Sequence, residues 1–151
     1  AYTLPLPLQH QGLDFSFSGL KTAVREVVAK LGPLTDQHRA DVCASLQHTI
    51  SKLLVIKATR ALEQTGLGCL VLSGGVAANQ ALRQALEAAC AQRGVTFFAP
   101  PVADCTDNGL MIAYAGLLRA EAGIAPSPLT ENVRVRWPLA DLAAGAVADL
   151  A

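Results

Sequence analysis

The sequence predicts an α/β fold in which largely parallel strands pack against helices, and three observations support this fold class. The chain of 151 residues is 52% hydrophobic and only 16% charged, which is enough apolar material for the core of one domain. An apolar run at residues 69–72 ends at Gly74 and Gly75, and apolar residues at helical spacing follow. A second short apolar run, residues 95–99, comes after that helix and ends at a pair of prolines, and both runs predict buried strands. A strand, a helix and a strand in this order form a βαβ unit, whose strands are parallel neighbours.

The amino-terminal part is predicted to contain a loop, a short strand and a helix. Residues 1–13 carry two prolines and no periodicity, so we expect a loosely ordered segment. Residues 14–18 alternate polar and aromatic side chains, which is typical of a short half-buried strand. Helical spacing of apolar residues over residues 19–31 predicts a helix, with Ser18 as its N-cap and Gly32 at its end.

The longest predicted element is a helix over residues 36–64, a stretch without glycine or proline. Thr35 is its expected N-cap, and the helix is roughly 40–45 Å long at about 1.5 Å per residue. We expect it to pack across a sheet. Its apolar stripe contains Ala40, Cys43, Leu46, Ile50, Leu53, Leu54, Ala58, Ala61 and Leu62.

The carboxyl-terminal part is predicted to hold two more helices and an extended segment. The helix after the glycine turn is expected to run to about Arg93. A helix over residues 110–119 is apolar on almost every side, which predicts a buried helix. Residues 132–139 alternate in the manner of a short extended segment, and the alanine-rich residues 140–151 are expected to be loosely ordered. No repeat or linker divides residues 1–151, so we expect one partial domain.

Charge and cysteine content narrow the class of protein. The net charge is zero and the pI is about 7.0, so the chain has no electrostatic footprint of its own for nucleic acid or a membrane. None of the four cysteines forms a CxxC pair, which favours buried thiols in a reducing cytoplasm. We see no signal peptide and no apolar run long enough to span a membrane. The chain begins without methionine, which is compatible with a piece of a longer protein.

Two segments are candidate anion sites. Gly74 and Gly75 lie where a strand meets a helix, and there free backbone N–H groups and the helix dipole could bind a phosphate. The alternative, an ordinary strand-to-helix turn, is favoured from spacing alone. Ser16, Ser18 and Lys21 gather at a helix N-terminus and could also hold an anion, but plain capping by serine is favoured.

The acidic segment before the last helix is a candidate metal site. Asp107 is either a hard oxygen ligand for a metal or a carboxylate that complements the helix dipole, and local sequence favours the second interpretation. Asp104 has the same ambiguity, and we interpret it as a cap. His10, His38 and His48 lack metal-ligand spacing, so we interpret them as surface or hydrogen-bonded residues.

Four stretches together resemble one known pattern. They are residues 14–22 (DFSFSGLKT), 72–79 (LSGGVAAN), 100–109 (PPVADCTDNG) and 136–139 (RWPL), in the same order and at similar separations. Over about residues 14–139 the chain resembles the carboxyl-terminal part of the TsaD family, the tRNA adenosine threonylcarbamoyltransferases. The resemblance implies an actin-like fold of the acetate kinase, sugar kinase and Hsp70 type, with only its second lobe present.

The resemblance also implies an activity. The family transfers a threonylcarbamoyl group from threonylcarbamoyl-adenylate to the exocyclic amine of the adenosine beside the anticodon of tRNA. By this resemblance Asn79 contacts the nucleotide, Gly74 and Gly75 line the same pocket, and Asp107 is a ligand of an iron or zinc ion. Ser16, Ser18 and Lys21 match a signature of the family, but we assign them no specific catalytic role. The implied partners are tRNA and the complex subunits TsaB and TsaE, in the cytoplasm and without a membrane.

One departure from the family is large. The other two metal ligands come from an HxxGH-type motif in the first lobe, and this chain contains no such motif. We therefore expect the chain alone to be inactive. Two alternatives stay open: a non-catalytic lobe that only binds or assembles partners, and another actin-like phosphotransferase.

Overall fold

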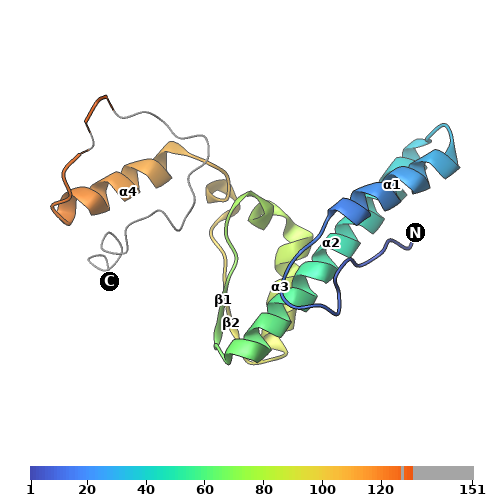
Figure 1. Ribbon diagram of the computed structural model, residues 1–151, viewed down its shortest axis with the longest axis horizontal. Helices are drawn as coiled ribbons and strands as arrows, with labels where there is room; N and C mark the ends of the chain where they lie inside the picture. The colour runs from blue at the N-terminus through green and yellow to red at the C-terminus, as the bar shows by residue number, and fades with distance from the viewer. Residues whose placement is uncertain (127, 131–151) are drawn as a thin grey trace. The chain divides into compact units, whose positions relative to one another are not determined.

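The computed structural model describes residues 1–126 and 128–130 and contains helices, two strands and two short 3₁₀ turns (Figure 1). In chain order the elements are α1 (Ser18–Leu31), α2 (Asp36–Thr65), β1 (Cys69–Val71), η1 (Gly75–Ala78), α3 (Gln80–Ala91), β2 (Thr96–Phe98), η2 (Val102–Asp104) and α4 (Gly109–Glu121). The predicted segments at residues 132–139, 136–139 and 140–151 lie outside the described residues. Residues 1–106 pack as one unit and the chain from Asp107 onward as a second, so each is described by itself.

The two strands form the predicted parallel pair. Leu70 lies opposite Phe97 in the register, and Leu72 N donates to Phe98 O at 2.9 Å just beyond β1. The connection between the strands is η1 and α3, and α3 packs against β2. The sequence prediction of a βαβ unit with helices packed around parallel strands is therefore confirmed.

The prediction that both strands are buried is wrong. Val71 and Phe98 are 65% and 55% exposed, although they are opposite each other in the register. Side chains alternate between the two faces of a strand. Leu70 and Phe97 are half-buried on the other face, so the described residues cover only one side of the pair.

Helix α2 organises the first unit, because both α1 and α3 pack against it (Figure 1). Its 30 residues span about 45 Å at 1.5 Å per residue. The Thr35 side chain accepts from His38 N at 3.1 Å, so the predicted N-cap is confirmed. At the other end Gly66 adopts φ 68°, and its N–H donates a hydrogen bond to Leu62 O.

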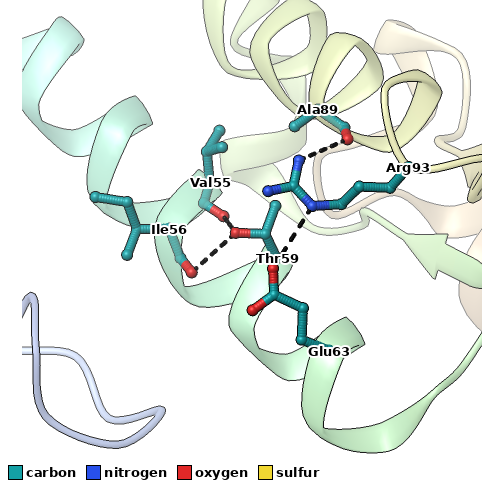
Figure 2. Close-up of polar contacts among 6 residues, drawn as sticks. All are labelled: Val55, Ile56, Thr59, Glu63, Ala89 and Arg93. Atoms are coloured by element: carbon teal, nitrogen blue, oxygen red, sulfur yellow. Dashed lines mark hydrogen bonds and ion pairs between the residues drawn. The ribbon is translucent and has the colours of Figure 1, made fainter.

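The buried face of α2 differs from the apolar stripe that the sequence predicts. Hydroxyls lie in it, and those of Ser45 and Thr49 donate to carbonyls one turn earlier, Asp41 O at 2.7 Å and Ser45 O at 2.8 Å. Figure 2 shows the same arrangement for Thr59, which donates to Val55 O and Ile56 O. Because these hydroxyls are satisfied within the helix, they can be buried with little cost. The buried residues are Val42, Ser45, Thr49, Ser51, Leu53, Lys57, Thr59 and Leu62.

The segment 1–13 has no helix or strand, but it is tied to α2. Tyr2 N donates to Ser45 Oγ at 2.9 Å, and Leu4 is buried. Lys57 is only 2% exposed, and burial and Arg60 lower the pKa of its ammonium group from the ordinary value. Both cations donate to main-chain carbonyls of the loop: Lys57 to Leu8, Gln11 and Gly12, and Arg60 to Gln9 and Gly12. The sequence did not predict these contacts.

The short strand predicted at residues 14–18 is absent from the structure. Phe15 and Phe17 stack instead, with ring centroids 6.1 Å apart, and both rings are more than a third exposed. The prediction of Ser18 as N-cap is also wrong: α1 begins at Ser18, the flanking residue is Phe17, and no side chain caps the helix.

Two burial predictions are corrected. Cys90 and Cys105 are buried as expected, and burial raises the pKa of the Cys90 thiol. Cys43 and Cys69 are exposed, because Cys43 lies beside a surface pocket and Cys69 begins the one-sided sheet. Helix α4 forms as predicted but has no buried residue in the described structure.

No helix among the described residues combines the length and the apolar character needed to cross a membrane.

Candidate functional site

The glycine turn follows β1, and only one of its two glycines has a backbone conformation that requires glycine. Gly74 has φ 83° and ψ 176°, a conformation that essentially only glycine adopts. Gly75 begins η1 without a positive φ, and a Cβ built on it would have no heavy atom within 4 Å. The backbone therefore requires a glycine at 74. At 75 neither the backbone nor the packing requires one, and the space around it is open, as it is at the other described glycines.

Asn79 connects the turn to α3 and to α2. The sequence predicted a helix directly after the glycines, but η1 intervenes and α3 begins only at Gln80. Asn79 is the N-cap of α3, with its Oδ1 accepting from Leu82 N at 3.0 Å. Its Nδ2 donates to Gln47 Oε1 on α2 at 3.2 Å. Both ends of the side-chain amide are held, so its orientation is fixed.

A pocket of about 220 Å³ opens beside Asn79, between α2 and the segment that leads into α3. Its walls are mostly apolar, and the side-chain amides of Gln47 and Asn79 are among its polar groups. It is smaller than the roughly 300–1,000 Å³ of sites for drug-sized ligands, so it suits one part of a nucleotide. The lining residues are Cys43, Leu46, Gln47, Ile50, Ser51, Val76, Asn79 and Leu82.

The segments that follow the two parallel strands meet, as the sequence predicts for the carboxyl end of a sheet. Turn η1 contacts turn η2. Arg83 on α3 donates to Ala77 O in η1, to Pro100 O just after β2, and to Cys105 Sγ at 3.0 Å. One side chain thus bridges the glycine turn and the segment that leads to Asp107.

Asp107 is exposed and lies two residues before the first residue of α4, Gly109. The N-cap of that helix is Asn108, whose Oδ1 accepts from Met111 N at 3.1 Å. The interpretation of Asp104 as a cap is wrong, because it is the last residue of η2, which no side chain caps. Asp107 belongs to the second unit and Asn79 to the first, so their proximity remains a prediction.

The described residues do not complete a metal site by themselves. Within residues 1–126 and 128–130 no group of three or more His, Cys, Asp or Glu side chains could hold an ion. One carboxylate is a suitable ligand for iron or zinc, but such ions take several ligands. Asp107 therefore fits as one member of a set whose other members come from elsewhere. His38 does not join it. The His38 side chain is half-buried and its Nδ1 is buried without a hydrogen-bond partner in the described structure, so neither the surface nor the hydrogen-bonded interpretation describes it fully.

The other candidate anion site, formed by Ser16, Ser18 and Lys21, lies at the start of α1. Ser16 Oγ and Ser18 Oγ are 3.4 Å apart, and Ser18 and Lys21 are exposed. Neither serine caps α1, so the favoured capping interpretation is wrong.

Sequence reasoning missed Gln47 and Arg83. Arg83 is four residues after Asn79, one helical turn along α3, and this spacing could have placed it near the glycine turn. Gln47 is 32 residues from its partner Asn79, and no local pattern distinguishes it from the other polar residues of α2.

Comparison with known proteins identifies related chains. A family model described as tRNA N6-adenosine threonylcarbamoyltransferase, TsaD, matches residues 1–114. Proteins with the same name are similar to the chain: one from Variovorax paradoxus is 48% identical over 100% of this chain, one from Bordetella petrii 51% over 95%, and one from Methylibium petroleiphilum 52% over 96%. The chain spans only 44%, 43% and 43% of these relatives, respectively.

Proposed function

The chain belongs to the TsaD family of tRNA N6-adenosine threonylcarbamoyltransferases, and we propose that it supplies the nucleotide-facing part of such an enzyme. The reaction is transfer of the threonylcarbamoyl group from threonylcarbamoyl-adenylate to the exocyclic amine of the adenosine beside the anticodon. The observation that carries this proposal is the family match over residues 1–114, which includes Gly74, Gly75, Asn79 and Asp107. Because the relatives are more than twice as long, the activity is proposed for a whole-length protein rather than for these residues alone.

The fold proposal is the second lobe of an actin-like protein. The parallel pair β1–β2 with α3 between them is compatible with such a lobe. Actin-like lobes bind a nucleotide between them, so the one-sided burial of the strands is also compatible with a missing neighbour. Exposure of Val71 and Phe98 supports this, since large apolar side chains on one face usually have a partner.

The adenylate is proposed to lie against the glycine turn and Asn79. Gly75 leaves open space for the close approach of a ligand, and Asn79 presents a fixed amide at the edge of a small, mostly apolar pocket. An amide can donate to and accept from an adenine edge or a ribose hydroxyl. The second amide, on Gln47, would help to select the ligand orientation.

Asp107 is proposed as one carboxylate ligand of an iron or zinc ion. The ion would polarise an oxygen of the acyl-phosphate. Its other ligands would lie outside this chain, which contains no HxxGH motif. The partners proposed are tRNA and the subunits TsaB and TsaE, and the zero net charge of this chain suggests that basic tRNA contacts lie on other parts of the assembly.

The proposal is tested by separating the two roles of Asn79. Asn79→Ser keeps a side-chain oxygen that can cap α3 but loses the amide, whereas Asn79→Ala loses both. In the whole-length protein, calorimetry with AMP should show that both variants bind at least tenfold more weakly. Only Asn79→Ala should also unfold more easily, by about 1 kcal/mol. Wild-type affinity in Asn79→Ser would show that Asn79 only caps a helix.

The metal proposal has its own measurement. Asp107→Ala should lower the stoichiometry of bound iron or zinc, measured by plasma mass spectrometry on the whole-length protein. Asp104→Ala is the matched control, because it removes a carboxylate three residues earlier in the same segment. Equal metal content in the two variants would remove Asp107 from the ligand set.

A further inference from the structure

Arg83 is held by three neutral acceptors that come from three different segments. Its Nε–H donates to Ala77 O, and its Nη2 donates to Pro100 O and to Cys105 Sγ, the last at 3.0 Å. Ala77 belongs to η1, Pro100 follows β2, and Cys105 follows η2. The side chain therefore closes a bridge between loops that are separated by more than twenty residues.

The environment of the bridge indicates a geometric role. Ala77 is fully buried and Cys105 is only 3% exposed, and the guanidinium is partly buried between them. Both ion pairs found among the described residues are formed by other arginines, so Arg83 meets no carboxylate there. A surface arginine that only adds solubility would not reach two backbone carbonyls and a buried thiol.

The bridged segments are those that carry the proposed site. Ala77 is two residues before Asn79, and Cys105 is two residues before Asp107 in the sequence. We propose that Arg83 is a positioning residue, which fixes the glycine turn against the segment 100–105 and so sets the geometry of adenylate binding. This inference rests on the proposed function, and it adds a residue that does not itself contact the reacting atoms.

The shape of the arginine side chain explains why no other cation would serve. Its planar fork presents N–H groups in several fixed directions, so that Nε and Nη2 can reach acceptors on two sides at once. A lysine at 83 would keep the charge and the helix propensity, but all its donors are on one nitrogen, whereas Arg83 reaches Ala77 O from Nε and the other two acceptors from Nη2.

The test uses the whole-length protein with Arg83→Met and Arg83→Lys. Arg93→Met is the matched control, because Arg93 also donates to a main-chain carbonyl, Ala89 O at 3.1 Å (Figure 2). Its Nε lies 3.8 Å from Glu63 Oε1. The readouts are the Kd for AMP by calorimetry, kcat and KM separately for transfer from threonylcarbamoyl-adenylate to tRNA, and the helical circular-dichroism spectrum.

Arg83→Met and Arg83→Lys should each raise the Kd for AMP and the KM for the adenylate at least tenfold, with the helical spectrum retained. Arg93→Met should change neither constant by more than about twofold. Any of three results would overturn the proposal. They are wild-type Kd and KM in Arg83→Met, return of both constants to wild-type values in Arg83→Lys, and an equal increase of both constants in Arg93→Met. If Arg83→Met does not fold, Arg83→Lys decides, and if neither folds, Arg83 serves folding and the proposal is overturned. Failure of the wild type to bind AMP or modify tRNA would instead refute the proposed function.

Discussion

Replacing Gly75 by alanine should weaken nucleotide binding without lowering the stability of the protein. A Cβ on Gly75 has no heavy atom within 4 Å, and Gly75 is not among the glycines with positive φ. At such a position a change from glycine to alanine stabilises by about 0.4–1 kcal/mol, because the unfolded chain loses freedom. Weaker binding in Gly75→Ala could therefore not be explained by loss of folding.

Gly74→Ala provides the contrast at the neighbouring position. Gly74 has φ 83° and ψ 176°, which an alanine reaches only with strain. The strain costs on the order of 1–3 kcal/mol. At roughly 2–4 °C per kcal/mol for a domain of this size, the Tm should fall by about 2–12 °C. Its binding defect, if any, would be inseparable from this loss of stability.

The two variants are compared in the whole-length protein by thermal unfolding and by calorimetry with AMP. Gly75→Ala should keep or raise the Tm and weaken AMP binding about tenfold or more, equivalent to about 1.4 kcal/mol. Gly68→Ala is the control, because its Cβ also enters open space but the residue precedes β1 rather than following it. Wild-type affinity in Gly75→Ala would refute the close approach of the nucleotide, and a fall in its Tm would refute the account of the backbone.

Three further outcomes are expected. AMP should protect Cys43, which lines the pocket, from alkylation by iodoacetamide, but it should not protect Cys69, which is also exposed. Equal labelling of the two cysteines, read by mass spectrometry, would place the nucleotide elsewhere. Thr35→Ala should lower the free energy of unfolding by about 1 kcal/mol in urea titration, because the bond to His38 N caps α2, and an unchanged midpoint would contradict this. Because the pKa of Lys57 is lowered in the folded protein, the unfolded chain binds more protons between that pKa and 10.5, so the Lys57 contribution to stability should rise with pH across this window. Lys57→Met should flatten that slope in unfolding measured from pH 8 to 10, and an unaltered slope would contradict the assignment.

Local rules were sufficient for the helices and the parallel strands. Thr35 and Gly66 mark the ends of α2 through contacts within a few residues, which a sequence displays directly. The strand prediction at residues 14–18 failed because alternation of aromatic residues also arises when Phe15 and Phe17 stack on each other without a partner strand.

Contacts between distant residues could not be predicted. Lys57 and Arg60 of α2 bind carbonyls more than forty residues earlier, and no local pattern encodes such a partner. The burial of hydroxyls on α2 was missed for a related reason, since Thr49 satisfies its own polar group within the helix and then behaves as a core residue. At the site, the glycine turn and Asn79 were visible in the sequence, whereas Gln47 was not.

The structure changes the physical basis on which a phosphate could bind here. The sequence suggested that the free N–H groups and dipole of α3 would receive it. However, Asn79 Oδ1 already accepts from Leu82 N, and Asn79 N itself donates to Val76 O. A phosphate that used either of these two donors would have to replace the bond that the donor already makes. The open space at Gly75 involves no such competition, because nothing in the first unit occupies it. We therefore base the proposed binding of an adenylate on close approach to the turn rather than on the helix dipole.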